Sequence, residues 1–319
     1  MKARIDFIRR AIFPSCLVFI VAACSVNEDD IYAKTDVVYG HKAGMALTFD
    51  YFQPKNSNGA AVIFINSGGF YSPIFVRENV NDPSSRWLLY QVLQGGKSFD
   101  LGLQLSFSPL LDAGFTVFNI RHGSAEKFNL NEIVADCRSA IRFIRSNSDQ
   151  FGIDQDKIGL WGASAGGYLS IFLGMSSRVD KLEAAAPNDQ LSDRVNAIVG
   201  YFPTGYDINA ELEQFPGLQT LEALKVDSTS LDSLSIKNHI TSDDPPVLII
   251  YGDEDSGFIT GPSMAMYNEM EKKGVISELL VLKGTGHLWR GRDGKYNTIA
   301  GEKAASKMVS WFQQYLVSD

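Results

Sequence analysis

Six short apolar runs, rich in β-branched residues, recur along this chain and alternate with segments of helical spacing. Such runs are typical of parallel strands that are buried on both faces of a sheet. We therefore predict an α/β fold with a mostly parallel central sheet and helices on both faces. Its strands are expected at residues 61–66, 115–120, 157–162, 196–201, 246–252 and 278–284.

The other elements follow from periodicity. Apolar residues at helical spacing predict helices over residues 130–148, 262–273 and 297–316. The alternating stretch LTFDYFQP, residues 47–54, predicts an antiparallel strand near the start of the sheet. Two longer stretches, 70–108 and 202–244, interrupt the pattern. Since ligands bind at the carboxyl ends of strands in such sheets, we interpret both as cap-like insertions that form pocket walls.

The N-terminus predicts export from the cell. Four basic residues precede an apolar run over residues 11–23, which is too short to span a bilayer and is typical of a signal peptide. The run ends Val21-Ala22-Ala23-Cys24, which resembles the lipobox of bacterial lipoproteins. That resemblance implies acylation of Cys24, and Ser25 after it favours the outer membrane of the bacterial cell envelope. The alternative is an ordinary secretory signal with an incidental cysteine.

Cleavage before Cys24 would remove four basic side chains and Asp6, which leaves a formal net charge of −11 instead of −8. A chain this acidic is not expected to bind nucleic acid. No repeat or low-complexity linker divides the remainder. We predict a signal peptide over residues 1–23, a tether over residues 24–35 and one domain over residues 36–319.

Cofactor chemistry finds no support in the pattern. We see no His/Cys cluster at metal-ligand spacing and no glycine-rich phosphate loop, so neither a metal nor a cofactor is expected. Apart from the signal and the anchor, Cys137 is the one remaining cysteine. No disulfide can therefore form within the mature chain, and we expect Cys137 to be a small core residue on a helix.

The stretch LWGASAGGYLS, residues 160–170, contains the candidate nucleophile. Ser164 follows a predicted strand and opens a predicted helix, with Gly162 and Gly166 flanking it at the spacing G-x-S-x-G. A sharp strand-to-helix turn needs residues without bulk, and it holds a serine oxygen at the N-terminus of the helix. The alternative is that Ser164 only caps the helix.

A serine nucleophile needs a histidine base, which in turn needs an acid to orient it. In this strand order the acid precedes the histidine. His287, in KGTGHLW, is the one histidine that follows the acidic cluster Asp253, Glu254 and Asp255. The residues alone do not separate the three acids.

Here the chain resembles the α/β-hydrolases, whose acid commonly stands three residues after the glycine that ends this strand. The glycine is Gly252, so the resemblance implies Asp255 as the acid. Asp207, in PTGYD, is the alternative because some hydrolases carry their acid after the preceding strand.

The stretch FINSGGFYS stands where the esterase and lipase branches have a His-Gly-Gly-Gly motif. Asn66 and Ser67 replace the histidine and the first glycine, a departure from the hormone-sensitive-lipase branch, while Gly68 and Gly69 match. An oxyanion hole needs backbone N–H groups, which Gly68 or Gly69 and Ala165 could supply. The alternative is a plain turn that ends the strand.

Longer phrases extend the resemblance over about residues 36–316. FGIDQDKIGLWGASAGG and SDDPPVLIIYGDED resemble the bacterial esterase branch that includes feruloyl-esterase-like and acetyl-xylan-esterase-like proteins. The resemblance implies a serine esterase acting on a small-molecule or oligosaccharide ester. Two alternatives stay open: a peptidase resembling prolyl oligopeptidase, or a non-catalytic lipoprotein that uses the fold for binding.

One further stretch has no assigned role. NIRHGSAEKF stands where the relatives have a tyrosine–arginine pair. We expect Arg121 and His122 to lie at the carboxyl end of their strand, in a structural hydrogen-bonding role rather than a catalytic one.

The acyl group is inferred from the candidate lid segments ENVNDPSSRW and NDQLSDRV, which are polar. A long-chain lipase needs apolar surface, since each buried methylene contributes about 0.8 kcal/mol. We therefore predict short acyl groups, acetyl above all, on a carbohydrate or similar alcohol. A feruloyl group is the alternative, given the aromatic residues Phe70, Tyr71 and Trp87.

The anchor is tested by Cys24→Ser, which should abolish acylation and release the protein from membranes. Detergent partitioning of the wild type and the variant measures the effect. Equal membrane retention of both forms would place the anchor elsewhere.

Overall fold

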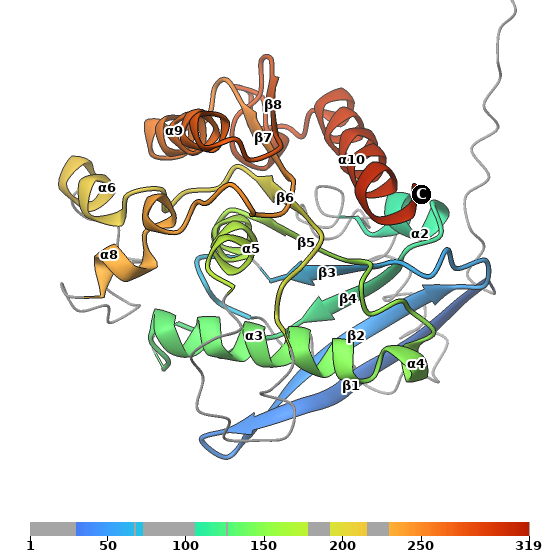
Figure 1. Cartoon of the computed structure of the whole chain (residues 1–319). Coiled ribbons are helices and arrows are strands. Elements are labelled where there is room, and N and C mark those ends of the chain that lie inside the picture. Colours follow the sequence, from blue (N-terminus) through green and yellow to red (C-terminus); the bar gives the residue numbers. More distant parts are fainter. Residues whose placement is uncertain are drawn as a thin grey trace, which may run out of the picture.

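The computed structural model describes residues 30–66, 68–72, 106–125, 127–177, 192–215 and 230–318. Eight strands among these residues form one sheet in the order β1-β2-β4-β3-β5-β6-β7-β8 (Figure 1). Strands β1 and β2 pair antiparallel with each other, and β2 pairs antiparallel with β4. All other neighbours are parallel. The strands are β1 (Ile31–Lys42), β2 (Met45–Pro54), β3 (Ala61–Ile65), β4 (Thr116–Ile120), β5 (Ile158–Ala163), β6 (Ala197–Tyr201), β7 (Val247–Gly252) and β8 (Ser277–Leu282).

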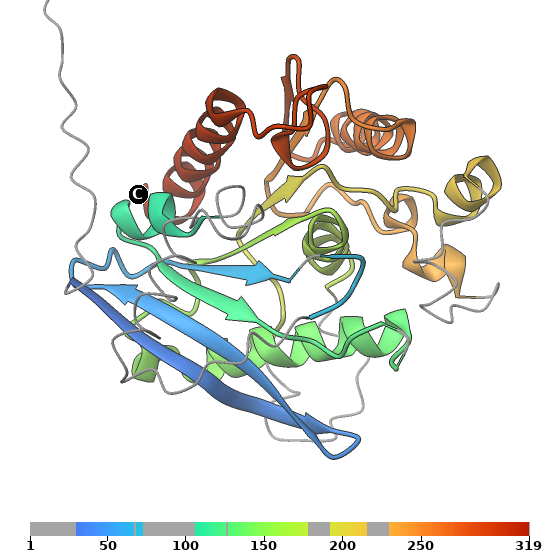
Figure 2. The same ribbon diagram turned by 180° about the vertical axis from the view of Figure 1, so that it is seen from behind.

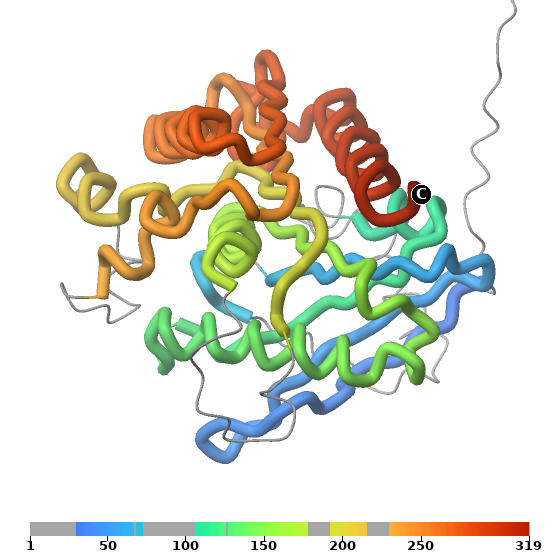
Figure 3. The backbone as a smooth tube through the Cα atoms, in the orientation of Figure 1, coloured from blue at the N-terminus to red at the C-terminus, as the bar shows by residue number. Residues whose placement is uncertain are grey.

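The six predicted parallel strands and the predicted antiparallel strand are all present. Every residue of β3 to β7 is buried, which explains why their sequences are continuously apolar. β8 lies at the edge of the sheet and is only partly buried. The chain passes from the N-terminal hairpin at one end of the sheet to the C-terminal helices at the other (Figure 3).

Helices cover both faces of the sheet, as expected (Figures 1 and 2). One face carries α3 (Leu130–Ser146), α5 (Ala165–Met175) and α9 (Gly257–Lys273). The other carries α2 (Ser108–Asp112) and α10 (Thr298–Phe312), which continues as the π-helical turn η5 (Gln313–Val317). The short elements are α4 (Ser148–Phe151), α6 (Ile208–Gln214), α8 (Leu231–Leu234), η3 (Ile236–Asn238) and η4 (His287–Trp289).

The domain begins earlier than predicted. Strand β1 starts at Ile31, inside the segment 24–35 that was predicted to be a tether, and Ile31 pairs with Pro54 of β2. The polar composition of this segment is misleading, because alternate side chains of β1 are partly buried against the core while the others face solvent. A tether can therefore extend no further than Asp30.

Several sequence predictions lie outside the described residues: the signal peptide, Cys24, Ser67, Trp87 and the candidate lid 78–87. Within the described residues no helix is long and apolar enough to cross a membrane. Cys137 is a fully buried free thiol on α3, as expected.

Helix α9 begins at Gly257, earlier than the predicted start at residue 262, and contains Pro262. A proline lacks the N–H that would bond the carbonyl four residues earlier. That carbonyl belongs to Phe258, and it accepts a hydrogen bond from the Thr204 hydroxyl at 3.3 Å. Because Pro262 has no N–H, the Phe258 carbonyl remains available as an acceptor for the loop after β6.

The turn between β5 and α5 depends on glycines. A Cβ atom on Gly162 would lie 2.2 Å from the Gly166 carbonyl oxygen, and one on Gly166 would lie 2.4 Å from the Ile65 carbonyl oxygen. Both obstacles are backbone atoms, which cannot rotate away. The first turn of α5 can therefore lie against the end of β3 only because these side chains are absent.

We predict opposite effects for two Gly→Ala substitutions in helices. Gly166→Ala should destabilise the protein by about 1–3 kcal/mol, because the new methyl group collides with backbone. Gly261→Ala, in α9, should stabilise it by roughly 1 kcal/mol, since a Cβ there meets nothing within 4 Å. Urea unfolding measures the free energy of unfolding of both variants. Equal changes in the two variants would contradict the close approach of α5 to the end of β3.

Candidate active site

Ser164 occupies the turn between β5 and α5 in a conformation that few residues adopt. Its backbone has φ 52° and ψ −119°, and its N–H donates to the Tyr201 carbonyl at the end of β6 at 2.9 Å. Positive φ is unusual for a residue with a side chain and is a feature of strained turns at active sites.

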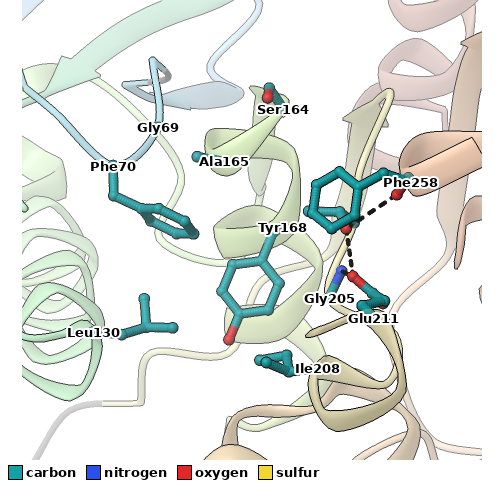
Figure 4. A pocket seen from close by; sticks show the side chains of 11 residues that line it. Gly69, Phe70, Leu130, Ser164, Ala165, Tyr168, Gly205, Ile208, Glu211 and Phe258 are labelled. Carbon is teal, nitrogen blue, oxygen red and sulfur yellow. Dashed lines mark hydrogen bonds between the residues drawn. The ribbon is translucent and has the colours of Figure 1, made fainter. Parts of the chain in front are cut away.

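The capping alternative is not supported by the geometry. Ser164 stands at the N-cap position of α5, but its side chain makes no capping hydrogen bond. Ser164 is instead one of the residues that line a cavity (Figure 4).

Asp255 and His287 lie together at the ends of β7 and β8. Asp255 Oδ2 lies 3.0 Å from His287 Nδ1. The Asp255 side chain is only 2% exposed, whereas the His287 side chain is 38% exposed. The carboxylate is thus buried behind the ring and leaves Nε2 as the nitrogen that can face a substrate.

In the structure the candidate acids have different partners. Asp253 accepts a hydrogen bond from the Gly284 N–H at 2.8 Å and pairs with Lys283 at 3.3 Å. Glu254 pairs with Arg292 at 2.9 Å. Both thus hold turns at the surface and make no contact with His287.

Asp207, the alternative acid, lies elsewhere. Its carboxylate pairs with Lys237 at 2.5 Å and caps helix α6 through the Ala210 N–H. These partners occupy the carboxylate, so Asp207 does not orient His287.

The His287 loop is fixed by backbone hydrogen bonds and by aromatic packing. Glu254 N–H donates to the Thr285 carbonyl at 3.0 Å, which ties the loop to the turn that carries Asp255. The ring of His287 lies 4.5 Å, centroid to centroid, from that of Phe202, which also packs on Trp289. The imidazole is therefore held from two sides.

Phe202 also links the histidine to the serine. It follows Tyr201, whose carbonyl accepts the Ser164 N–H. Within the described part of the chain, however, the Ser164 hydroxyl and the His287 ring make no hydrogen bond to each other. Such bonds are often long in enzymes without substrate and tighten when it binds.

The segment predicted to form the oxyanion hole has an unusual backbone. Gly68, Gly69 and Phe70 have φ values of 97°, 67° and 68°, three successive residues in the left-handed region. Gly69 and Ala165 line the same cavity as Ser164. Ala165 is the first residue of α5, so its N–H has no partner within the helix.

The cavity beside Ser164 has a volume of about 90 Å³. Tyr168 lies one helical turn below Ser164, with Phe70 and Leu130 on one side and Phe258 on the other (Figure 4). The lining is mostly apolar and consists of Gly69, Phe70, Leu130, Ser164, Ala165, Tyr168, Thr204, Gly205, Ile208, Glu211 and Phe258.

Glu211 is a buried carboxylate in this lining. It accepts hydrogen bonds from the Thr204 hydroxyl at 2.5 Å, the Gly205 N–H at 2.9 Å and the Asp207 N–H at 3.1 Å. Burial nevertheless raises the pKa of Glu211 above its ordinary value, since desolvation outweighs these bonds. The carboxylate therefore organises the loop after β6 that forms one pocket wall.

Several lining residues were not singled out in the sequence. Tyr168 could have been found, because it lies four residues after Ser164 on the same helical face. No sequence pattern indicates that Glu211 lines the pocket, because its hydrogen bonds depend on how the loop after β6 folds back. Both predicted insertions do contribute to the pocket, through Phe70 and through residues 204–211.

The second candidate lid is misplaced. Its described part, residues 192–195, is bound by arginines of α3, and the next residue, Asn196, donates its N–H to Ile158 at the start of β5. Residues 192–195 thus lie at the amino ends of the strands, whereas Ser164 lies at the carboxyl ends. This described part does not cover the cavity.

Known proteins of similar sequence are esterases. The chain is 22% identical over 270 residues to a probable isoprenylcysteine alpha-carbonyl methylesterase of Arabidopsis thaliana, covering 80% of this chain and 51% of that protein. It is 28% identical over 155 residues to esterase LipC of Mycobacterium tuberculosis, covering 46% of this chain and 38% of LipC. This chain thus spans about half the length of the first relative, and less of the second.

Solved structures show the same architecture. A truncated carbohydrate esterase from gut microbiota has a TM-score of 0.66 at 22% identity, covering 91% of this chain and 98% of that one. An acetyl ester-xyloside bifunctional hydrolase from Caldicellulosiruptor lactoaceticus has a TM-score of 0.65 at 19% identity, covering 88% and 96%. The expected α/β-hydrolase fold is confirmed.

A family model agrees with these similarities. The BD-FAE model matches residues 93–270, which is more than half of the chain and includes both Ser164 and Asp255. The chain belongs to the BD-FAE family.

Proposed function

We propose that this protein is a serine esterase that hydrolyses carboxylic esters with Ser164, His287 and Asp255 as its catalytic triad. The observation that supports it most is the Asp255–His287 hydrogen bond of 3.0 Å, at the same edge of the sheet as the strained Ser164 turn. The known activity of similar esterases points to the same reaction class.

Acylation begins when the Ser164 hydroxyl oxygen attacks the ester carbonyl carbon. His287 Nε2 takes the hydroxyl proton and then delivers it to the leaving alkoxide oxygen as the ester bond breaks. Asp255 accepts the Nδ1–H, which fixes the tautomer and stabilises the transient imidazolium.

The tetrahedral intermediate carries its negative charge on the former carbonyl oxygen. The N–H groups of Ala165 and of Gly68 or Gly69 are the donors we assign to it. Gly69 is favoured by its place in the cavity lining. Water then attacks the acyl-enzyme and His287 takes a proton from it. His287 delivers this proton to the Ser164 oxygen as the acyl bond breaks, which releases the carboxylic acid and regenerates the Ser164 hydroxyl.

The size of the cavity supports a short acyl group. A cavity of about 150 Å³ lined by apolar side chains is known to hold a benzene molecule. The cavity beside Ser164, at about 90 Å³, is smaller and is bounded on one side by the Tyr168 ring. We therefore favour acetyl over feruloyl, on a carbohydrate or similar polar alcohol. The carbohydrate esterase among the similar structures is consistent with that alcohol.

The lipobox-like sequence supports a cellular location for this activity. We propose that the enzyme acts at the bacterial cell envelope, held at the membrane by a lipid on Cys24. Its substrates would then be esters that reach the envelope from outside the cytoplasm.

The triad is tested by substitution. Ser164→Ala should lower kcat on the order of 10⁴-fold or more and abolish labelling by a fluorophosphonate probe. Asp255→Asn should lower kcat about 10³- to 10⁴-fold, because the wrong histidine tautomer is favoured. Asp253→Asn, which alters the neighbouring surface acid, is the matched control and should remain active. Undiminished labelling of Ser164→Ala would overturn the assignment.

Acyl specificity is tested with nitrophenyl acetate, butyrate, octanoate and palmitate. We expect kcat/KM to be highest for the two short esters, and acetate to be released from acetylated xylan. Tyr168→Leu, which removes the ring that bounds the cavity on one side, should raise the relative rate on octanoate. A steady rise of the wild-type kcat/KM toward palmitate would indicate a lipase instead.

A further inference from the structure

Residues 119–125, which include the unassigned pair Arg121 and His122, lie beside residues 66 and 68–72, which we assign to the oxyanion hole. The two groups of residues lie at the carboxyl ends of the neighbouring parallel strands β4 and β3. Hydrogen bonds join them at both ends of the glycine-rich stretch.

The first connection is a buried asparagine pair. Asn66 Nδ2 donates to Asn119 Oδ1 at 2.9 Å and to the Ile120 carbonyl at 2.7 Å. Asn66 is 8% exposed, so these bonds are shielded from water. They fix the point at which the chain leaves β3 and enters Gly68 and Gly69.

The second connection lies after the glycines. The His122 N–H donates to the Ser72 hydroxyl oxygen at 3.1 Å, and the Ser72 N–H donates to the Ser124 hydroxyl oxygen at 3.0 Å. The Ala125 N–H donates to the Phe70 carbonyl at 3.0 Å. The exit of the loop is thus held by three bonds, all of which involve the backbone.

These bonds matter because the loop has little stability of its own. Three successive left-handed residues make no regular hydrogen-bond ladder, and Phe70 adopts its φ of 68° at a steric cost of about 1–2 kcal/mol. Contacts from outside must therefore hold the conformation.

The supporting segment is itself anchored by charged side chains, of which Asp50 and Asp136 are buried. Arg121 pairs with Asp50 at 2.7 Å and with Asp36 at 2.6 Å, both in the β1–β2 hairpin. The Gly123 N–H donates to Asp136 at 2.9 Å, and Asp136 pairs with Lys42 at 3.0 Å. The segment therefore connects the hairpin and α3 to the loop.

His122 contributes as a neutral ring. Burial lowers the pKa of its imidazole below the usual value, and Nδ1 lies 2.7 Å from the Gly123 carbonyl. His122 is not among the residues that line the cavity beside Ser164, and its structural role stays a prediction.

We propose that residues 119–125 set the position of the oxyanion-hole amides, with Asn66 and Ser124 as positioning residues for catalysis. This inference rests on the proposed function, because the amides of Gly68 and Gly69 stabilise charge only in the transition state. A misplacement of about 1 Å in such a site can lower the rate about 100-fold.

The test compares Ser124→Ala, Ser124→Thr and Asn66→Ala. Ser124→Ala and Asn66→Ala should lower kcat on nitrophenyl acetate about 10- to 100-fold with KM nearly unchanged. Ser124→Thr retains the hydroxyl acceptor and should recover most of the activity. If Asn66→Ala fails to fold, the two Ser124 variants still decide the question.

Asn58→Ala is the matched control. Asn58 lies at the amino end of β3, where its side chain donates to the Ala113 carbonyl at 3.1 Å and accepts the Ala60 N–H at 2.9 Å. It makes as many bonds as Asn66 but lies at the opposite edge of the sheet. Its loss should lower Tm and leave kcat unchanged.

Two further measurements separate positioning from general stability. A trifluoromethyl ketone inhibitor, which forms a tetrahedral adduct with a serine, should bind more weakly to Ser124→Ala by the same factor as kcat/KM falls. The pH profile of kcat/KM should not move, because the Asp255–His287 pair is untouched. If Ser124→Ala lowers only Tm, with kcat at the level of the Asn58→Ala control, the inference is wrong.

Failure of the inference can be told from failure of the proposed function. If the wild type hydrolyses nitrophenyl acetate and loses fluorophosphonate labelling in Ser164→Ala, the function stands whatever the Ser124 variants do. If the wild type neither reacts with the probe nor cleaves esters, the function itself is wrong and the inference falls with it.

Discussion

The close approach of helix α5 to the ends of three strands is the constraint on which the rest of the site depends. Gly162, Gly166 and Gly167 would each bring a Cβ within 2.9 Å of a backbone oxygen if they were alanine. Without side chains there, the first turn of α5 enters between the strand ends. Ser164 is then held at a positive φ, and Ala165 lines the same cavity as Gly69.

The two halves of the site around this turn are built differently. The histidine half rests on aromatic packing, with the His287 ring 4.5 Å from Phe202, and on a carboxylate buried behind the ring. The oxyanion half rests on polar side chains that bind backbone groups, such as Asn66 and Ser124. Both arrangements restrict motion before substrate arrives, which is the condition for electrostatic stabilisation of a transition state.

The cavity also combines two kinds of surface. Tyr168 forms one side of it with an apolar ring, yet the Tyr168 hydroxyl donates to the Leu234 carbonyl at 2.7 Å and so is fixed to the C-terminal end of α8. Gly205 packs directly on that ring, since a Cβ there would lie 2.2 Å from it. The size of the pocket is therefore set by the helix that follows the candidate nucleophile Ser164 and by a loop organised around Glu211.

The sequence by itself determined the sheet, its parallel strands and the candidates Ser164 and His287, because buried strands are nearly continuously apolar and because glycines mark the sharp turn at Ser164. It did not reveal strand β1, whose alternate burial was hidden by a polar composition, nor the position of residues 192–195 at the far edge of the sheet. Choosing Asp255 from the residues alone was impossible, since Asp253, Glu254 and Asp255 have the same chemistry. Only the tertiary structure directs Asp255 toward His287 and the other two toward surface partners, because side-chain direction in a turn depends on contacts with segments distant in the chain.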